Sequence, residues 1–132
     1  MQTYDRWNET KKKISQNKKA INFNQKEIFM TYLGKNIGYE QNGDADKNFL
    51  RPVLVYKKFS KNLFLGIPLT TTQKDDKFYF SFIFKGTKKS TAILSQIKLI
   101  DSKRCLYRMG QIKNKDYKEL IKKLESLMKV TP

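Results

Sequence analysis

Histidine is absent from this sequence of 132 residues, and cysteine occurs once, at Cys105. Without histidine, no imidazole can transfer the proton, which excludes serine and cysteine triads and the paired-histidine scheme of some ribonucleases. Histidine-ligated zinc is excluded as well. One cysteine cannot form a disulfide within the chain, so we expect a reducing, cytoplasmic location. Because no base stands beside it, Cys105 is predicted to be a small buried residue rather than a nucleophile.

Long apolar runs and cofactor motifs are also missing. No stretch approaches the roughly 20 apolar residues that a membrane helix needs, and the polar N-terminal segment does not resemble a secretion signal. No phosphate-binding loop or dinucleotide fingerprint occurs. Asp44 and Asp46 do not provide the number and spacing of ligands that a calcium loop needs. We therefore expect no membrane association, no metal and no cofactor.

Acidic residues are scarce beside basic ones. Lysine and arginine number 28 and aspartate and glutamate 12, so the net charge is +16. Such an excess repels itself in a compact chain, and strongly basic domains are typical of nucleic-acid binders. The charge therefore indicates a polyanionic partner, although a solubility device or a lysine-rich genome composition would also produce it. Apolar residues make up 39%, which suffices for one folded domain.

The hydrophobic pattern predicts two parts. Residues 1–24 are expected to form a basic helical extension, because Tyr4, Trp7 and Ile14 fall on one narrow helical face. This extension either packs through its aromatic residues or contacts RNA or a partner. Residues 25–132 are expected to form the domain itself.

The domain reads as mainly β with a final helix. Short apolar or alternating segments predict strands at 27–32, 53–59, 63–69, 78–84, 91–94, 97–100 and 106–109. Asn114 is a candidate helix cap. After it, one apolar stripe is formed by Tyr117, Leu120, Ile121, Leu124, Leu127 and Met128. This pattern predicts a small barrel or strongly curved sheet that a C-terminal helix closes.

Four segments resemble the PemK/MazF toxin family. They are G-K-N-I-G-Y-E-Q-N-G at 34–43, R-P-V-L-V at 51–55, I-P-L-T at 67–70 and L-S-Q-I-K-L-I-D-S-K-R at 94–104. The resemblance covers roughly residues 25–128. It implies an SH3-like barrel with a C-terminal helix, usually a homodimer, and a toxin that cleaves RNA and is blocked by an antitoxin. Lys26 departs from the pattern, because the family usually has glycine before the first strand.

The resemblance transfers the family's catalytic pair to Arg51 and Thr70 and its loop acid to Glu40, with Gln41 beside it. A guanidinium can bind two phosphate oxygens, and a threonine hydroxyl can donate to a third. Glu40 is the best candidate base in a chain without histidine. The residues alone allow other interpretations. Arg51 could form a structural salt bridge, Thr70 could simply end a strand, and Glu40 could pair with Arg51 or a lysine.

Further RNA contacts are expected from five residues. Gln41, Ser95 and Gln96 are candidates for contacts to bases or backbone, and Lys57 and Lys58 for contacts to phosphates. For Ser95 and Gln96, a hydrogen-bond network in a turn is the alternative.

These observations predict the toxin of a type II toxin–antitoxin system. We expect a metal-independent, sequence-selective endoribonuclease that cleaves single-stranded RNA to 2′,3′-cyclic phosphate and 5′-hydroxyl ends. Its partners would be a cognate acidic antitoxin and a second copy in a homodimer. One alternative is a non-catalytic toxin or binding module of the same fold that acts through RNA or protein contact, as a gyrase poison does. A nucleoid-type structural protein is another.

Overall fold

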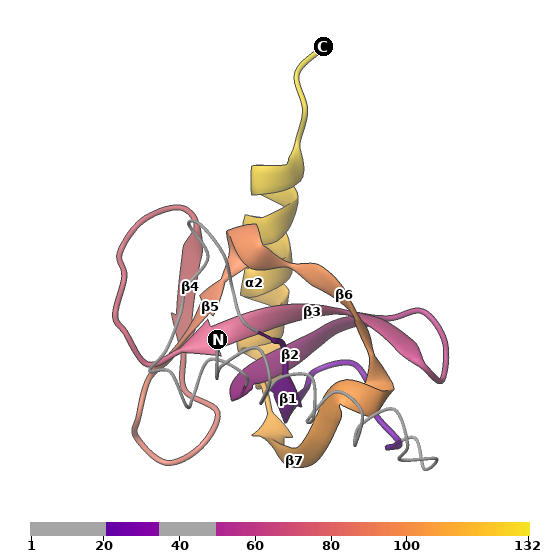
Figure 1. Cartoon of the computed structure of the whole chain (residues 1–132). Coiled ribbons are helices and arrows are strands. Elements are labelled where there is room, and N and C mark those ends of the chain that lie inside the picture. Colours follow the sequence, from indigo (N-terminus) through magenta and orange to yellow (C-terminus); the bar gives the residue numbers. More distant parts are fainter. Residues whose placement is uncertain (1–20, 35–49) are drawn as a thin grey trace, which may run out of the picture.

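A computed structural model describes residues 21–34 and 50–132, which form one antiparallel sheet and one long helix (Figure 1). Two short 3₁₀ turns, η1 (Leu94–Gln96) and η2 (Ser102–Arg104), join the later strands. The helix is α2 (Asn114–Met128). The strands are β1 (Glu27–Tyr32), β2 (Leu50–Lys58), β3 (Leu63–Thr70), β4 (Tyr79–Phe82), β5 (Ser90–Ile93), β6 (Lys98–Asp101) and β7 (Cys105–Gln111).

The sheet curls because β3 pairs with two different strands along one edge. The end of β3 pairs with β5, where Leu69 lies opposite Ala92, and its beginning pairs with β6, where Phe64 lies opposite Ile100. The path β4-β5-β3-β2-β1-β7 stays open, since no pairing joins β4 to β7 within the described segments. The predicted mainly β fold with a curved, barrel-like sheet and a C-terminal helix is confirmed, in an open form.

The predicted N-terminal helix falls almost entirely in residues 1–20, outside the described part, so the boundary at residue 24 stays a prediction.

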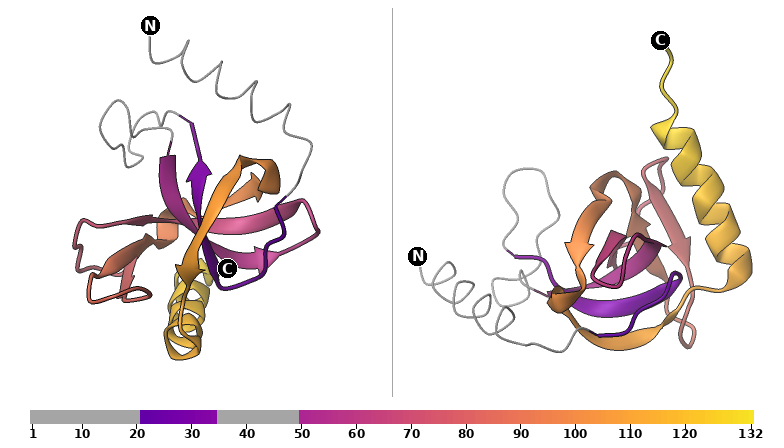
Figure 2. Two further views of the ribbon diagram at one scale, coloured as in Figure 1. Left: turned by 90° about the horizontal axis from the view of Figure 1, so that it is seen from below. Right: turned by 90° about the vertical axis from the view of Figure 1, so that its right-hand side faces the viewer.

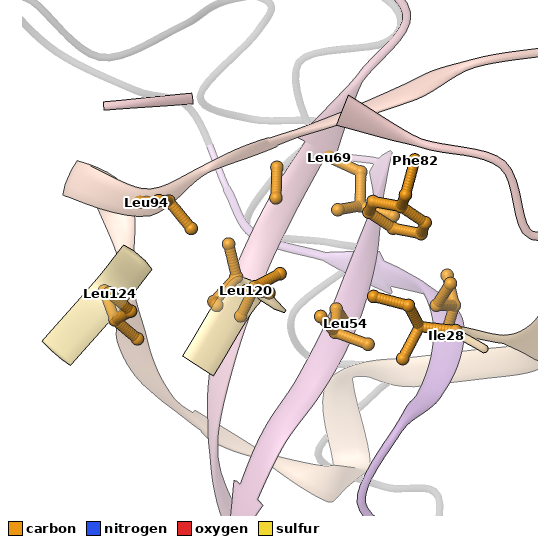
Figure 3. Close-up of a cluster of buried hydrophobic side chains, with 10 residues drawn as sticks. Ile28, Leu54, Leu69, Phe82, Leu94, Leu120 and Leu124 are labelled. Carbon is orange, nitrogen blue, oxygen red and sulfur yellow. The ribbon is translucent and has the colours of Figure 1, made fainter. Parts of the chain in front are cut away.

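Helix α2 covers one face of the curved sheet (Figure 2). Leu120 and Leu124 are its two buried residues, and both enter the main core, where burial of one such side chain stabilises the fold by about 1.5–3 kcal/mol (Figure 3). This α2-side cluster consists of Ile28, Leu54, Ile67, Leu69, Phe82, Ala92, Leu94, Ile112, Leu120 and Leu124. The apolar stripe predicted for the C-terminal helix is confirmed at Leu120 and Leu124 but is wrong at Met128. Met128 is 62% exposed, because the last turn of α2 extends beyond the sheet (Figure 1).

The predicted cap of α2 is also wrong. Lys113 occupies the cap position, no side chain caps the helix, and Asn114 is already helical. The side chain of Asn114 has another partner, since its Oδ1 accepts a hydrogen bond of 2.7 Å from Lys26 Nζ. This contact ties the start of the helix to the residue before β1.

Lys26 adopts a backbone conformation that favours glycine, with a φ of 81°. Its N–H donates to the carbonyl of Val55, and its own carbonyl accepts from Ile112, both at 2.9 Å. The turn is therefore held from two sides. The left-handed conformation explains in physical terms why glycine suits this position, and lysine accepts it at a cost of roughly 1–2 kcal/mol.

The alternating segment at 78–84 forms a shorter strand than predicted. Phe82 is buried, but Phe78 belongs to a turn, where its N–H donates to Asp76 Oδ1 at 2.8 Å. The N–H of Tyr79 donates to the carbonyl of Asp76 at 3.2 Å. These bonds hold the backbone in the turn until Tyr79, where β4 begins.

A second, smaller cluster lies on the face of the sheet opposite α2. It consists of Phe23, Phe29, Val53, Val55, Phe64, Ile100 and Cys105. Gly66 leaves room for it, because a Cβ there would lie 2.6 Å from both Ile100 and Val53. Burial raises the pKa of Cys105 to about 11. The prediction of a small buried cysteine is thus confirmed.

Candidate functional site

Arg51 and Thr70 lie on neighbouring strands. The antiparallel register of β2 and β3 sets Val53 opposite Pro68 and Leu54 opposite Ile67. The paired part of the two strands ends at Val53 and Pro68; continued by two residues, the register would set Arg51 at the level of Thr70 and on the same face of the sheet. Both side chains remain partly accessible to solvent.

The Arg51 side chain reaches towards the end of β3. Its Nη1 donates a long hydrogen bond of 3.4 Å to the carbonyl oxygen of Leu69. Burial lowers the pKa of Arg51 from its ordinary value, yet a guanidinium stays protonated in proteins. Arg51 therefore places a permanent positive charge beside Thr70.

The Thr70 hydroxyl is oriented by its own chain. Its Oγ1 accepts a hydrogen bond of 3.2 Å from the backbone N–H of Thr72. This local turn holds the hydroxyl oxygen where the chain leaves β3. This bond uses a lone pair of the oxygen, so the hydroxyl hydrogen can still be donated to a ligand. A hydroxyl donor beside a permanent cation is suited to bind an anion, and a phosphoryl group in particular.

Two further hydroxyls continue this row across the sheet. Thr91 lies opposite Thr70 on β5, and Ser81 lies opposite Thr91 on β4. The Oγ of Ser81 and the Oγ1 of Thr91 are 2.9 Å apart. Sequence reasoning missed both residues. The alternation at 78–84 indicates that Ser81 points away from Phe80 and Phe82, but only the strand pairing shows that Ser81 lies beside Thr91.

This row faces away from α2. Leu69, Phe82 and Ala92, which are sequence neighbours of Thr70, Ser81 and Thr91, belong to the α2-side cluster. Because side chains alternate along a strand, the three hydroxyl residues point to the opposite face. On that face, the row and the smaller apolar cluster occupy different parts of the sheet.

Lys57 and Lys58 lie at the other end of β2 from Arg51, about 20 Å away along the strand. Lys58 Nζ donates to the carbonyl of Phe23 at 2.8 Å and lies 4.6 Å from the centre of its ring. Lys57 is exposed, with Nζ 5.6 Å from the centre of the Phe59 ring. The structure therefore does not group these lysines with the Arg51–Thr70 pair.

Ser95 and Gln96 form η1 beside the middle of β3, between the segments that pair with β5 and β6. Ser95 is exposed and Gln96 is half-buried. Glu40 and Gln41 lie outside the described residues. The structure thus gives no position for the predicted base.

Within residues 21–34 and 50–132, no group of three or more histidine, cysteine, aspartate or glutamate side chains is arranged to hold a metal ion. Among the same residues, no helix has the length and apolarity needed to span a membrane.

Comparisons with solved structures agree with this architecture. Form I of MazF from Deinococcus radiodurans has a TM-score of 0.64 at 18% identity, covering 82% of this chain and 97% of that one. The Mycobacterium tuberculosis toxin MazF-mt6 has a TM-score of 0.61 at 12% identity, covering 80% and 99%. A mycobacterial endoribonuclease in complex with its cognate antitoxin has a TM-score of 0.56 at 13% identity, covering 82% and 97%. At these identities the similarity establishes the fold.

The sequence comparison establishes the family. No curated protein sequence matches the chain. The profile of the family described as PemK-like, MazF-like toxin of type II toxin–antitoxin system matches residues 24–128. Because this match spans most of the sequence, the chain belongs to the PemK-like, MazF-like family of type II toxins.

Proposed function

We propose that this toxin is a metal-independent, sequence-selective endoribonuclease that cuts single-stranded RNA. The observation that supports the proposal is the position of Arg51 beside the end of β3, where its guanidinium donates to the carbonyl of Leu69, the residue before Thr70. In the proposed reaction, the 2′-hydroxyl of RNA attacks the adjacent phosphorus and the 5′-oxygen leaves. The products are a 2′,3′-cyclic phosphate and a 5′-hydroxyl.

Arg51 and Thr70 stabilise the charge that develops on the phosphoryl oxygens. The guanidinium fork binds two oxygens of the phosphorane, and Thr70 donates to a third. Removal of one such donor typically lowers the rate by about 10²–10³-fold. Glu40 is proposed as the general base and Gln41 as a contact to the RNA, from the resemblance of the 34–43 segment alone.

The remaining RNA contacts divide into near and distant groups. Ser95 and Gln96 flank β3 and would contact bases or backbone close to the cut. Lys57 and Lys58 would contact phosphates further along the strand, because they lie at the far end of β2. With a net charge of +16, binding should weaken as salt increases.

The proposed partners are an acidic antitoxin and a second copy of the toxin. The Deinococcus radiodurans toxin has been solved as a MazE–MazF complex, and the mycobacterial endoribonuclease was solved with its cognate antitoxin. An acidic, flexible antitoxin segment would complement the basic surface of this chain. We propose a cytoplasmic homodimer.

The test is cleavage of single-stranded RNA of mixed sequence by the purified protein in EDTA, with mapping of the 5′-hydroxyl ends. The wild type should cut at a recurring short motif. Arg51→Ala and Thr70→Ala should each lower the rate by about 100-fold or more, and Arg51→Lys, which keeps the charge but loses the fork, should lie between. Lys118→Ala on the exposed side of α2 is the matched control. RNA left uncut by the wild type across varied sequences would favour the non-catalytic binding module instead.

A further inference from the structure

The outer face of β4 presents a hydroxyl two strands away from Thr70. Ser81 is exposed on this edge strand, whereas its partner Thr91 is fully buried. Within the described residues, Ser81 Oγ is the hydrogen-bond partner of Thr91 Oγ1, at 2.9 Å. A buried hydroxyl without a partner is costly, so this contact holds the two side chains in a defined arrangement.

The hydrogen-bond pattern indicates which oxygen donates. If Ser81 donated to Thr91, the hydrogen of the buried Thr91 hydroxyl would point to no acceptor among the described residues. If Thr91 donates to Ser81, the buried Thr91 hydroxyl uses its hydrogen and leaves only oxygen lone pairs without a partner. The hydrogen of the Ser81 hydroxyl then points to solvent. The second arrangement satisfies the buried donor. Ser81 is therefore set up to donate outwards, as Thr70 is.

The backbone that carries Ser81 is fixed from the opposite side. Phe82 is buried in the α2-side cluster. Lys123 of α2 donates from Nζ to the carbonyl of Tyr79 at 2.6 Å. Both contacts hold the short strand β4 (Tyr79–Phe82) against α2 while Ser81 faces away from the helix.

We propose that Ser81 is a further RNA-contacting residue, which donates to a non-bridging oxygen of the phosphate next to the scissile one, and that Thr91 is its positioning residue. This inference depends on the proposed nuclease function and extends its substrate contacts. Two strand spacings place Ser81 about 10 Å from Thr70, and two hydroxyl hydrogen bonds together span only about 6 Å. The two hydroxyls therefore meet successive phosphates of one RNA strand rather than a single phosphate.

The test is binding of an oligoribonucleotide that contains the cleaved motif and carries one 2′-deoxyribose at the cut, so that it cannot react. Ser81→Ala should weaken its binding about tenfold or more, because the contact involves a charged acceptor. With a methylphosphonate at the neighbouring phosphate, wild type and Ser81→Ala should bind equally in the diastereomer whose methyl group replaces the contacted oxygen. Thr91→Val should give a smaller loss, and Thr91→Ser should restore binding.

Ser126→Ala on the exposed surface of α2 is the matched control and should bind like the wild type. Thermal unfolding checks that each variant is folded. Binding by Ser81→Ala within twofold of the wild type, or a loss that persists with every methylphosphonate position, would overturn the assignment. If the wild type cuts all-ribose RNA while Ser81→Ala binds normally, this inference alone fails. If the wild type neither binds nor cuts RNA, the proposed function fails with it.

Discussion

The face of the sheet beneath α2 and the opposite face are built from alternate residues of the same strands, yet they carry different chemistry. Leu69, Phe82 and Ala92 enter the apolar cluster under the helix. Their neighbours Thr70 and Ser81 point the other way. The helix supplies apolar cover on one side, whereas on the other side Ser81 is exposed and Thr70 is partly accessible.

The two-residue period of the strands therefore separates the residues that stabilise the fold from those that carry the proposed chemistry. The α2 side should control the free energy of unfolding, and the Arg51 side should control RNA cleavage. The separation is not complete, because the opposite face also holds the smaller cluster around Phe29 and Cys105. Two changes test the division, and a third tests the turn that leads into β1.

The largest effect is expected for Leu120→Ala beneath α2. Leu120 is fully buried in the α2-side cluster, and removal of such a side chain lowers the free energy of unfolding by about 2–5 kcal/mol. Urea unfolding measures this loss. Cleavage per folded molecule should stay unchanged, in contrast to Arg51→Ala, which should lose cleavage and keep its stability. A Leu120→Ala protein that remains folded but cuts more slowly would contradict the separation of the faces.

A second, pH-dependent effect concerns Cys105 on the opposite face. Burial, and more weakly the charge of Asp101, raises the pKa of its thiol from 9.0 to about 11, although a hydrogen bond from Thr31 acts in the other direction. The folded state thus favours the neutral thiol. Below about pH 9 the neutral thiol adds on the order of 2 kcal/mol to the free energy of unfolding, and this contribution is lost as the pH rises towards 11.

Urea unfolding of wild type and Cys105→Ala at about pH 8 and at about pH 11 measures this contribution. The pKa values of Tyr56 and Tyr117 are also raised by burial, so part of the alkaline loss should remain in the variant. An identical alkaline loss in both proteins would show that the thiol does not contribute.

The smallest effect is expected for Lys26→Gly, at the turn that leads into β1. Glycine relieves the positive φ, which costs about 1–2 kcal/mol for other residues, but it adds about 0.5–1 kcal/mol of backbone entropy to the unfolded chain. The net expectation is a gain of about 0.5 kcal/mol in the free energy of unfolding, measured by urea denaturation. Lys26→Ala is the control, since it removes the bond to Asn114 and keeps the backbone strain. Equal stability of both variants would argue against strain at this turn.

Much of the fold could be predicted from the sequence, because strand and helix periods are local. The strand at 27–32 has the predicted bounds, and Leu120 and Leu124 occupy the predicted helical stripe. The errors arise where a specific contact differs from the one that the pattern suggests. Asn114 lies inside α2 rather than at its cap, and its side chain accepts from the distant Lys26. Phe78 lies in a turn, where its N–H binds the nearby Asp76.

The charge, the alternation of the strands, the family motifs and the absence of histidine follow from the amino-acid sequence alone, since these are properties of composition and spacing. The pairing of Thr70 with Thr91, the pairing of Thr91 with Ser81 and the contact of Arg51 with the end of β3 exist only in the folded chain. These residues stand on four strands, and hydrogen-bond register between segments distant in the chain brings the strands together. No local pattern contains that register, because it is chosen by which side chains can be buried beneath α2.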